Sequence, residues 1–180
     1  CGYNHTVAIQ SGGTLWSWGM NSWGQLGTSD RTVRYSPTQI GANIWTQVSS
    51  GQLHTAAILN GGLLFTWGNN SYGQLCTSDQ TARSSPTQIG SNLWRQAACG
   101  YRHTAAIQSN GSLWTWGLNS YGQLGTSDLT RRLSPVQITT GTIWSQVSTG
   151  SVHTSGILNN GSLFIWGNNS FGQLGTSDLT

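Results

Sequence analysis

The chain has 180 residues and a mass of 19.3 kDa, enough for one ordinary domain. Charged residues make up only 6%, against about 25% in an average domain, and all of them are Arg or Asp. This composition excludes a charge-laced helical protein and any mechanism that needs a catalytic Lys or a pair of Glu acid and base groups. The formal charge of +3 comes from scattered arginines and no apolar stretch is long, so we expect neither a nucleic-acid partner nor a membrane span.

Histidines spaced 49, 49 and 50 residues apart show that the chain is a tandem repeat. The aspartates and the second Trp of each predicted hairpin recur at the same steps. We divide the chain into modules at about 1–48, 49–97, 98–147 and 148–180, the last one truncated. The repeated positions are His5, His54, His103 and His153; Trp18, Trp67, Trp116 and Trp166; and Asp30, Asp79, Asp128 and Asp178.

Each module predicts four short strands, because no window shows helical periodicity. In the third module the first two strands cover 103–107 and 112–116 and turn at 110–111, an Asn-Gly pair suited to a tight hairpin. Equivalent turns are expected at 12–13, 61–62 and 160–161. The third strand surrounds Pro135 and should lie at an outer edge, since Pro cannot donate to a ladder. A turn-rich loop over 119–128 precedes it, and a fourth strand covers 143–147.

Four short strands in each 40–50 residues is the period of a β-propeller blade. The pattern CGYRHTAAI at 99–107, LWTWG at 113–117, GQLG at 122–125 and SPVQI at 134–138 closely resembles the regulator of chromosome condensation repeat. The resemblance covers the whole chain in four copies and implies an all-β propeller of four-stranded blades, with seven blades in the best-known members. It implies less about function, because the family includes exchange factors for small GTPases, a plant photoreceptor and propellers that serve only as binding or structural surfaces.

The register of the ends predicts an open arc of fourteen strands. The chain lacks one copy of the segment 131–148, so the first blade should miss its inner Trp strand and the fourth its outer proline strand. Such an arc would expose unpaired ladder edges at both ends. We therefore expect either a larger ring of about seven blades or an arc completed by another chain, including a homo-oligomer.

The repeated histidines and aspartates are interpreted as structural. One His in each blade at the same strand start would be spread around an axis and would not converge on a metal, so each imidazole should bond to nearby backbone or loop. Each Asp should accept backbone N–H groups or pair with an arginine such as Arg34, Arg83 or Arg132. We predict no catalytic, cofactor-binding or metal-binding residue and no cofactor.

Nine of the ten tryptophans occupy repeated strand positions, where large rings are expected to pack between blades. They are Trp16, Trp18, Trp45, Trp67, Trp94, Trp114, Trp116, Trp144 and Trp166. The tenth belongs to an aromatic position in the loop between the second and third strands. This position and the turn before the His strand supply the candidate interaction-face residues, namely Trp23, Tyr72, Tyr121, Phe171, Tyr3, Tyr101 and Arg102.

The blades are nearly interchangeable, and none is visibly specialised in sequence: residues 122–130 are identical to 172–180. We therefore predict a non-enzymatic propeller that acts as a structural or protein-interaction module. The neutral polar composition favours an exposed assembly, such as a phage or virion fibre or a cell-surface array, and an extracellular or virion-associated location. The alternative is an exchange factor-like propeller that binds a small GTPase through one asymmetric face.

Three cysteines form no CxxC pair. Cys1 and Cys99 hold equivalent positions two blades apart, beyond the reach of a disulfide. Cys76 stands where the other modules have Gly27, Gly125 and Gly175. We expect Cys76 either to have an ordinary negative φ or to lie in a loop that differs from the other three.

Overall fold

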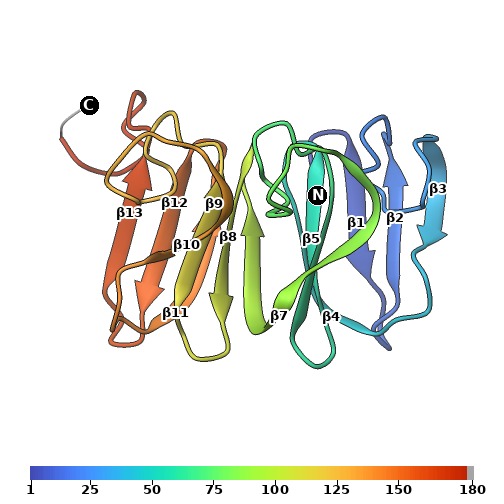
Figure 1. Cartoon of the computed structure of the whole chain (residues 1–180), viewed down its shortest axis with the longest axis horizontal. Helices are drawn as coiled ribbons and strands as arrows, with labels where there is room; N and C mark the ends of the chain where they lie inside the picture. Colours follow the sequence, from blue (N-terminus) through green and yellow to red (C-terminus); the bar gives the residue numbers. More distant parts are fainter. Residues whose placement is uncertain (178–180) are drawn as a thin grey trace.

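A computed structural model describes residues 1–177, and these residues form an all-β structure with no helix, arranged as a row of sheets (Figure 1). The hairpins turn at the four predicted places. The strands are β1 His5–Ile9, β2 Leu15–Gly19, β3 Arg34–Gln39, β4 Trp45–Ser50, β5 His54–Leu59, β6 Leu63–Gly68, β7 Arg83–Cys99, β8 His103–Gln108, β9 Leu113–Gly117, β10 Arg132–Ile138, β11 Trp144–Thr149, β12 His153–Leu158 and β13 Leu163–Gly167.

The strands form four blades in which all neighbouring strands are antiparallel. The first blade is β1-β2-β3, and the second is β4-β5-β6 with the first half of β7. The second half of β7 then pairs with β8 and begins the third blade, which continues through β9 and β10. The fourth blade is β11-β12-β13. The fourteen expected strands appear as thirteen because β7 runs unbroken from one blade into the next (Figure 1).

The terminal blades have three strands each, as the register of the ends predicts. Among the described residues, the first blade has no inner Trp strand and the fourth has no outer proline strand. Each complete blade takes its inner strand from the end of the preceding sequence module, so blades and modules are offset by one strand. The module boundaries and the number of blades in a full ring stay predictions.

The proline strands lie at the outer edges of the blades, where the missing N–H of Pro removes no hydrogen bond to a further strand. β3 and β10 end their sheets, and the register of each is interrupted where Pro37 and Pro135 lie. Pro86 interrupts the pairing of β7 with β6 in the same way. The single insertion in the last repeat step falls in the loop between β10 and β11, which confirms that it marks a loop.

The hydrophobic core is divided among the three junctions between successive blades. The predicted packing of tryptophans between blades is confirmed for seven of the nine: Trp67 and Trp116 are completely buried, and Trp45, Trp94, Trp114, Trp144 and Trp166 belong to these clusters or pack against them. Trp16 and Trp18 of the first blade are half-buried and belong to none of the clusters. The terminal faces differ, since no blade lies against them. Leu163 is 66% exposed, whereas its equivalents Leu64 and Leu113 are completely buried.

The expectation for Cys76 is wrong. Its φ is +64°, and its loop has the same turn as the glycine-containing loops: Cys76 N donates to Gly73 O at 3.0 Å, as Gly27 N does to Gly24 O. A left-handed conformation costs a non-glycine residue about 1 kcal/mol. Cys76 is buried in the apolar cluster between the second and third blades, and this burial offsets the strain and raises the pKa of its thiol to about 12. All three cysteines are free.

Candidate functional site

Two kinds of loop converge at one end of the blades and form what we call the loop face, the upper end in Figure 1. Long loops over 20–33, 69–82 and 118–131 lead from each hairpin to the proline strand. Short turns at 51–53, 100–102 and 150–152, together with residues 1–4, precede the His strands. The opposite, hairpin end carries the tight turns at 12–13, 61–62, 110–111 and 160–161. The described segment after β13, 168–177, lies at the same end and is included in the loop face, which therefore contains all seven candidate interaction residues.

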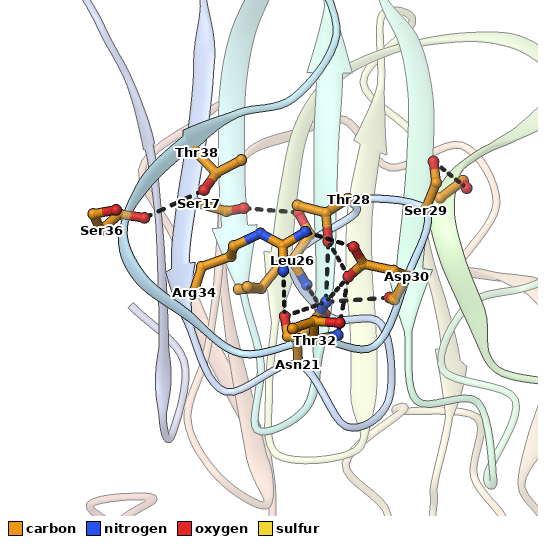
Figure 2. Close-up of polar contacts among 11 residues, drawn as sticks. Ser17, Asn21, Leu26, Thr28, Ser29, Asp30, Thr32, Arg34, Ser36 and Thr38 are labelled. Atoms are coloured by element: carbon orange, nitrogen blue, oxygen red, sulfur yellow. Dashed lines mark hydrogen bonds and ion pairs between the residues drawn. The ribbon is translucent and has the colours of Figure 1, made fainter.

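Each long loop is held by a buried asparagine. Asn21 Nδ2 donates to Thr28 Oγ1 and to Asp30 Oδ1, both at 3.0 Å, and Asn21 Oδ1 accepts from Leu26 N at 3.0 Å (Figure 2). Arg34 Nη2 lies 2.5 Å from Asp30 Oδ2. The backbone N–H of Thr32 and then the Arg34 side chain lower the pKa of the Asp30 carboxyl. The conformation of the loop is therefore held by its own side chains and backbone.

The next two blades repeat this arrangement. Asp79 pairs with Arg83 and Asp128 with Arg132, each at 2.5 Å, and both carboxylates also accept a backbone N–H. The structural role predicted for the aspartates is thus confirmed for three of them. Asp178 lies outside the described residues.

The histidines bond across the blade junctions. His54 Nε2 lies 2.9 Å from Thr104 Oγ1 of the next blade, and Thr104 Oγ1 donates its hydrogen to Gln74 O at 2.9 Å. Trp116 Nε1 donates to the same carbonyl oxygen at 2.9 Å. Because the threonine hydroxyl has only one hydrogen, it must accept from a protonated Nε2. Burial lowers the pKa of His54 to about 3, so the imidazole is neutral.

Equivalent bonds join the other two junctions, through His5 with Thr55 and His103 with Thr154. His5, His54 and His103 are structural, as expected, but their partner is the hydroxyl of the next blade and not the local loop. No three His, Cys, Asp or Glu side chains among the described residues lie close enough together to hold a metal.

The aromatic loop position is presented in the same way by every blade. In each, the backbone N–H of the aromatic residue donates to the side-chain oxygen of a Gln two residues later, at 2.9–3.0 Å. Exposure differs between blades: Trp23 is 39% exposed, Tyr121 51% and Phe171 93%, whereas Tyr72 is half-buried. The half-burial of Tyr72 has a specific cause in the neighbouring blade.

Three of the predicted residues meet at the junction between the second and third blades. The guanidinium carbon of Arg102 lies 4.7 Å from the ring centroid of Tyr72 and 5.0 Å from that of Tyr101. Arg102 Nη1 donates to the Tyr72 hydroxyl at 2.8 Å, and Arg102 Nε lies 3.4 Å from Gln52 Oε1. These four residues, named here the Arg102 cluster, come from two blades.

The Arg102 cluster breaks the repeat, so the interpretation that no blade is specialised needs correction at this junction. The position of Arg102 is occupied by Asn4, Leu53 and Val152 in the other modules. None of these side chains can stack a cation on the neighbouring aromatic loop. The signal was present in the sequence as the one Arg at this position, but its partner Gln52 was not predicted.

The cluster borders a shallow hollow of about 310 Å³ where the inner turns of all four blades meet. Tyr3, Gln52, Tyr101 and Ser151 stand at equivalent repeat positions around it. Successive turns are bonded to one another, with Tyr101 N donating to Ser151 O at 3.0 Å. Tyr3, 72% exposed, is the most accessible aromatic ring at this hollow.

The sequence analysis also missed a glutamine that joins the inner strands. Gln47 Nε2 donates to Ala97 O at 2.7 Å and its Oε1 accepts from Ala97 N at 2.8 Å. Gln96 makes the same pair of bonds to Val147. Gln146, the equivalent in the fourth blade, is exposed because no further inner strand lies beside it.

Comparisons with known proteins agree with this architecture. The chain is similar to human WBSCR16, with 29% identity and a TM-score of 0.89 over 99% of this chain and 49% of that one. It is also similar in fold to Prp20p from Saccharomyces cerevisiae, with 20% identity and a TM-score of 0.85 over 98% of this chain and 46% of that one. The chain thus spans about half the length of these solved proteins.

A family model for the regulator of chromosome condensation (RCC1) repeat matches residues 12–58, 61–107 and 110–157. A second model of the same repeat matches 45–74, 94–123 and 144–173. These matches begin at the hairpin turns or at the inner Trp strands described above. The chain belongs to the RCC1 repeat family, and its fold is that family's β-propeller.

Proposed function

We propose that this chain is a non-enzymatic protein-interaction module that binds partner chains through its loop face. The observation that carries the proposal is the Arg102 cluster, a cation stacked on two tyrosines at a position where the other modules have no charged side chain. Tyr, Trp and Arg are the residues most enriched in the energetic centres of protein interfaces. Three of the aspartates hold their own loops and three of the histidines hold the blade junctions.

The relatives support binding as the general role of such a surface. Solved structures of yeast Prp20 are described as bound to Kap60 and in terms of binding to Gsp1p and histones. Those partners belong to Prp20, which is only 20% identical to this chain. We carry over the use of the propeller as a protein-binding surface. The exchange-factor alternative rests on this likeness alone.

A random-peptide library displayed on phage tests the proposal. Peptides retained by the wild-type chain should be lost by a variant with Tyr72→Ala and Tyr101→Ala on the loop face. The matched control is Ile44→Ser with Ile143→Ser, which changes two exposed apolar residues near the hairpin end. Failure to enrich any peptide, or equal loss from both variants, would contradict binding through the loop face.

We propose in addition that strands of another chain complete the terminal blades, as in a homo-oligomer. The support is the exposed Leu163 and the exposed Gln146, whose equivalents are used in the internal junctions. Light scattering over a range of concentrations tests it. A mass that rises with concentration, and that returns to the monomer value with Leu163→Glu, is expected. A strictly monomeric, cooperatively melting chain would contradict it.

The low charge content and the neutral polar surface lead us to propose an exposed assembly, such as a virion fibre or a cell-surface array, as the setting. Composition alone supports this setting. Immunogold labelling of intact particles or cells from the source is the direct test, and label found only after permeabilisation would contradict it. The described residues contain no helix long and apolar enough to cross a membrane.

A further inference from the structure

The loop face carries positive charge that no described residue neutralises. Each described Asp is paired with the Arg four residues later, at the start of the proline strand, at 2.5 Å. The remaining arginines are Arg31, Arg95, Arg102 and Arg131, and none has an ion-pair partner among residues 1–177. Arg95 lies outside the loop face, in β7, and donates to the backbone oxygens of Trp144 and Ser145. The other three belong to the loop face.

The guanidinium of Arg102 has free N–H donors in its plane that can bind a hydrogen-bond acceptor. Its stacking positions are used by Tyr72 and Tyr101, and its Nε–H and one Nη1–H point to Gln52 and to the Tyr72 hydroxyl. Three N–H groups, one on Nη1 and two on Nη2, have no partner among the described residues. The Tyr72 hydroxyl accepts from Arg102, and its own hydrogen is also free to donate. The site therefore offers several donors and no negative charge.

We propose that the loop face binds an acidic, extended protein segment, and that one Asp or Glu carboxylate of this segment bonds to the open edge of Arg102 beside the Tyr72 hydroxyl. This inference rests on the proposed function and names the chemistry of the partner. A carboxylate matches the planar fork of a guanidinium, and the pair is among the strong hydrogen-bonded contacts in proteins. Arg31 and Arg131, on the long loops of the first and third blades, attract further acidic residues of the same segment.

The stacked guanidinium explains why this cation and not the other two should anchor the segment. Arg31 and Arg131 are exposed, and among the described residues the Arg131 guanidinium is held only by the side-chain oxygen of Gln80, which accepts from its Nη1 and Nη2 at 3.0 and 3.2 Å. A partner must therefore order more of either side chain in order to use it. Arg102 is half-buried and already held by two rings and two hydrogen bonds. Binding to it costs less conformational entropy, and removing it should weaken binding more than removing either exposed arginine.

Fluorescence anisotropy with a labelled oligoglutamate peptide tests the inference, and an oligoglutamine peptide of the same length is the control probe. At an ionic strength near 0.1 M we expect the first peptide to bind and the second to bind at least about tenfold more weakly. Arg102→Gln should weaken oligoglutamate binding about tenfold or more, and Arg102→Lys should restore only part of it. Arg131→Gln should weaken it about two- to fourfold, and Arg95→Gln should leave it unchanged.

Equal binding of the two peptides, or equal affinity of the Arg102→Gln variant and the wild type, would overturn the inference. The inference would also be overturned if Arg95→Gln and Arg102→Gln weakened oligoglutamate binding equally. The net charge of the chain would then be enough to explain the binding. Thermal melts show whether each variant is folded. If Arg102→Gln does not fold, Arg102→Lys still tests the inference.

The peptide library separates this inference from the proposed function. Peptides that depend on Tyr72 and Tyr101 but show no enrichment in Asp or Glu would overturn the acidic segment and leave the interaction module standing. Enrichment in acidic residues that is lost with Arg102→Gln would support both.

Discussion

Replacing Thr104 by Val removes the hydroxyl that links two blades and leaves a side chain of nearly the same shape. The His54 Nε2–H donor then lies in a completely buried position without its acceptor at 2.9 Å. Gln74 O loses the Thr104 donor but keeps the Trp116 indole N–H at 2.9 Å. An orphaned buried donor costs about 1–3 kcal/mol, and the added methyl group returns about 0.8 kcal/mol. We expect the free energy of unfolding to fall by about 1 kcal/mol.

Thr6 provides a matched control for this substitution. It holds the same repeat position in the first blade, where no preceding blade supplies a His or a Gln carbonyl, and its hydroxyl has no hydrogen bond among the described residues. Thr6→Val should change the free energy of unfolding by less than about 0.5 kcal/mol. Urea titration followed by Trp fluorescence measures both variants, with the slopes compared to show that the unfolding reaction is the same. Equal effects at Thr104 and Thr6 would refute the stabilising role of the junction bond.

Three further changes test the packing and the titration of the core. Trp116→Ala should lower the free energy of unfolding by about 3–5 kcal/mol because the indole is completely buried. Trp23→Ala, on a ring that is 39% exposed, should lower it by less than about 1 kcal/mol. A denaturant titration that ranks the two variants otherwise would place Trp116 at the surface. Gly125→Ala should lower the free energy of unfolding by at least about 1 kcal/mol more than Gly175→Ala. The two glycines share a φ near +70°, but only at Gly125 would an added Cβ lie 2.9 Å from an indole nitrogen of the next blade. Equal shifts of the melting temperature would contradict this contact. Finally, burial lowers the pKa of His54 to about 3, so between about pH 6.5 and 3 the unfolded chain binds a proton that the folded chain does not. The free energy of unfolding should therefore fall as the pH drops through this window, and His54 alone should lower it by about 2 kcal/mol at pH 5. A free energy of unfolding that is constant between pH 7 and 5 would contradict a buried neutral imidazole.

The elements that could be predicted from the sequence are those set by a local pattern. The hairpin turns, the edge position of the proline strands and the burial of Trp67 and Trp116 each depend on residues within a few positions or on the repeat itself. The three-stranded terminal blades followed from the register of the repeat alone. These features needed no knowledge of how one blade lies on the next.

The features that could not be predicted depend on that placement. Thr104 was not expected to receive the His54 bond, because the two residues are 50 positions apart and belong to different blades. Cys76 was judged by its own backbone preference, whereas burial against the next blade decides its conformation. The contact of Arg102 with Tyr72 likewise joins two blades. Sequence analysis had selected both residues as surface candidates without any reason to pair them.

The hydrogen bonds at the three junctions connect residues about 30, 42, 50 and 56 positions apart, and none of these bonds spans more than 56. The longest loop that a junction between two successive blades must close is therefore about one repeat. Since the entropy of loop closure rises only with the logarithm of length, each junction closes at nearly the same cost. A nascent chain can thus complete one junction after another as repeats leave the ribosome, and whole repeats can be gained or lost without slowing any single closure.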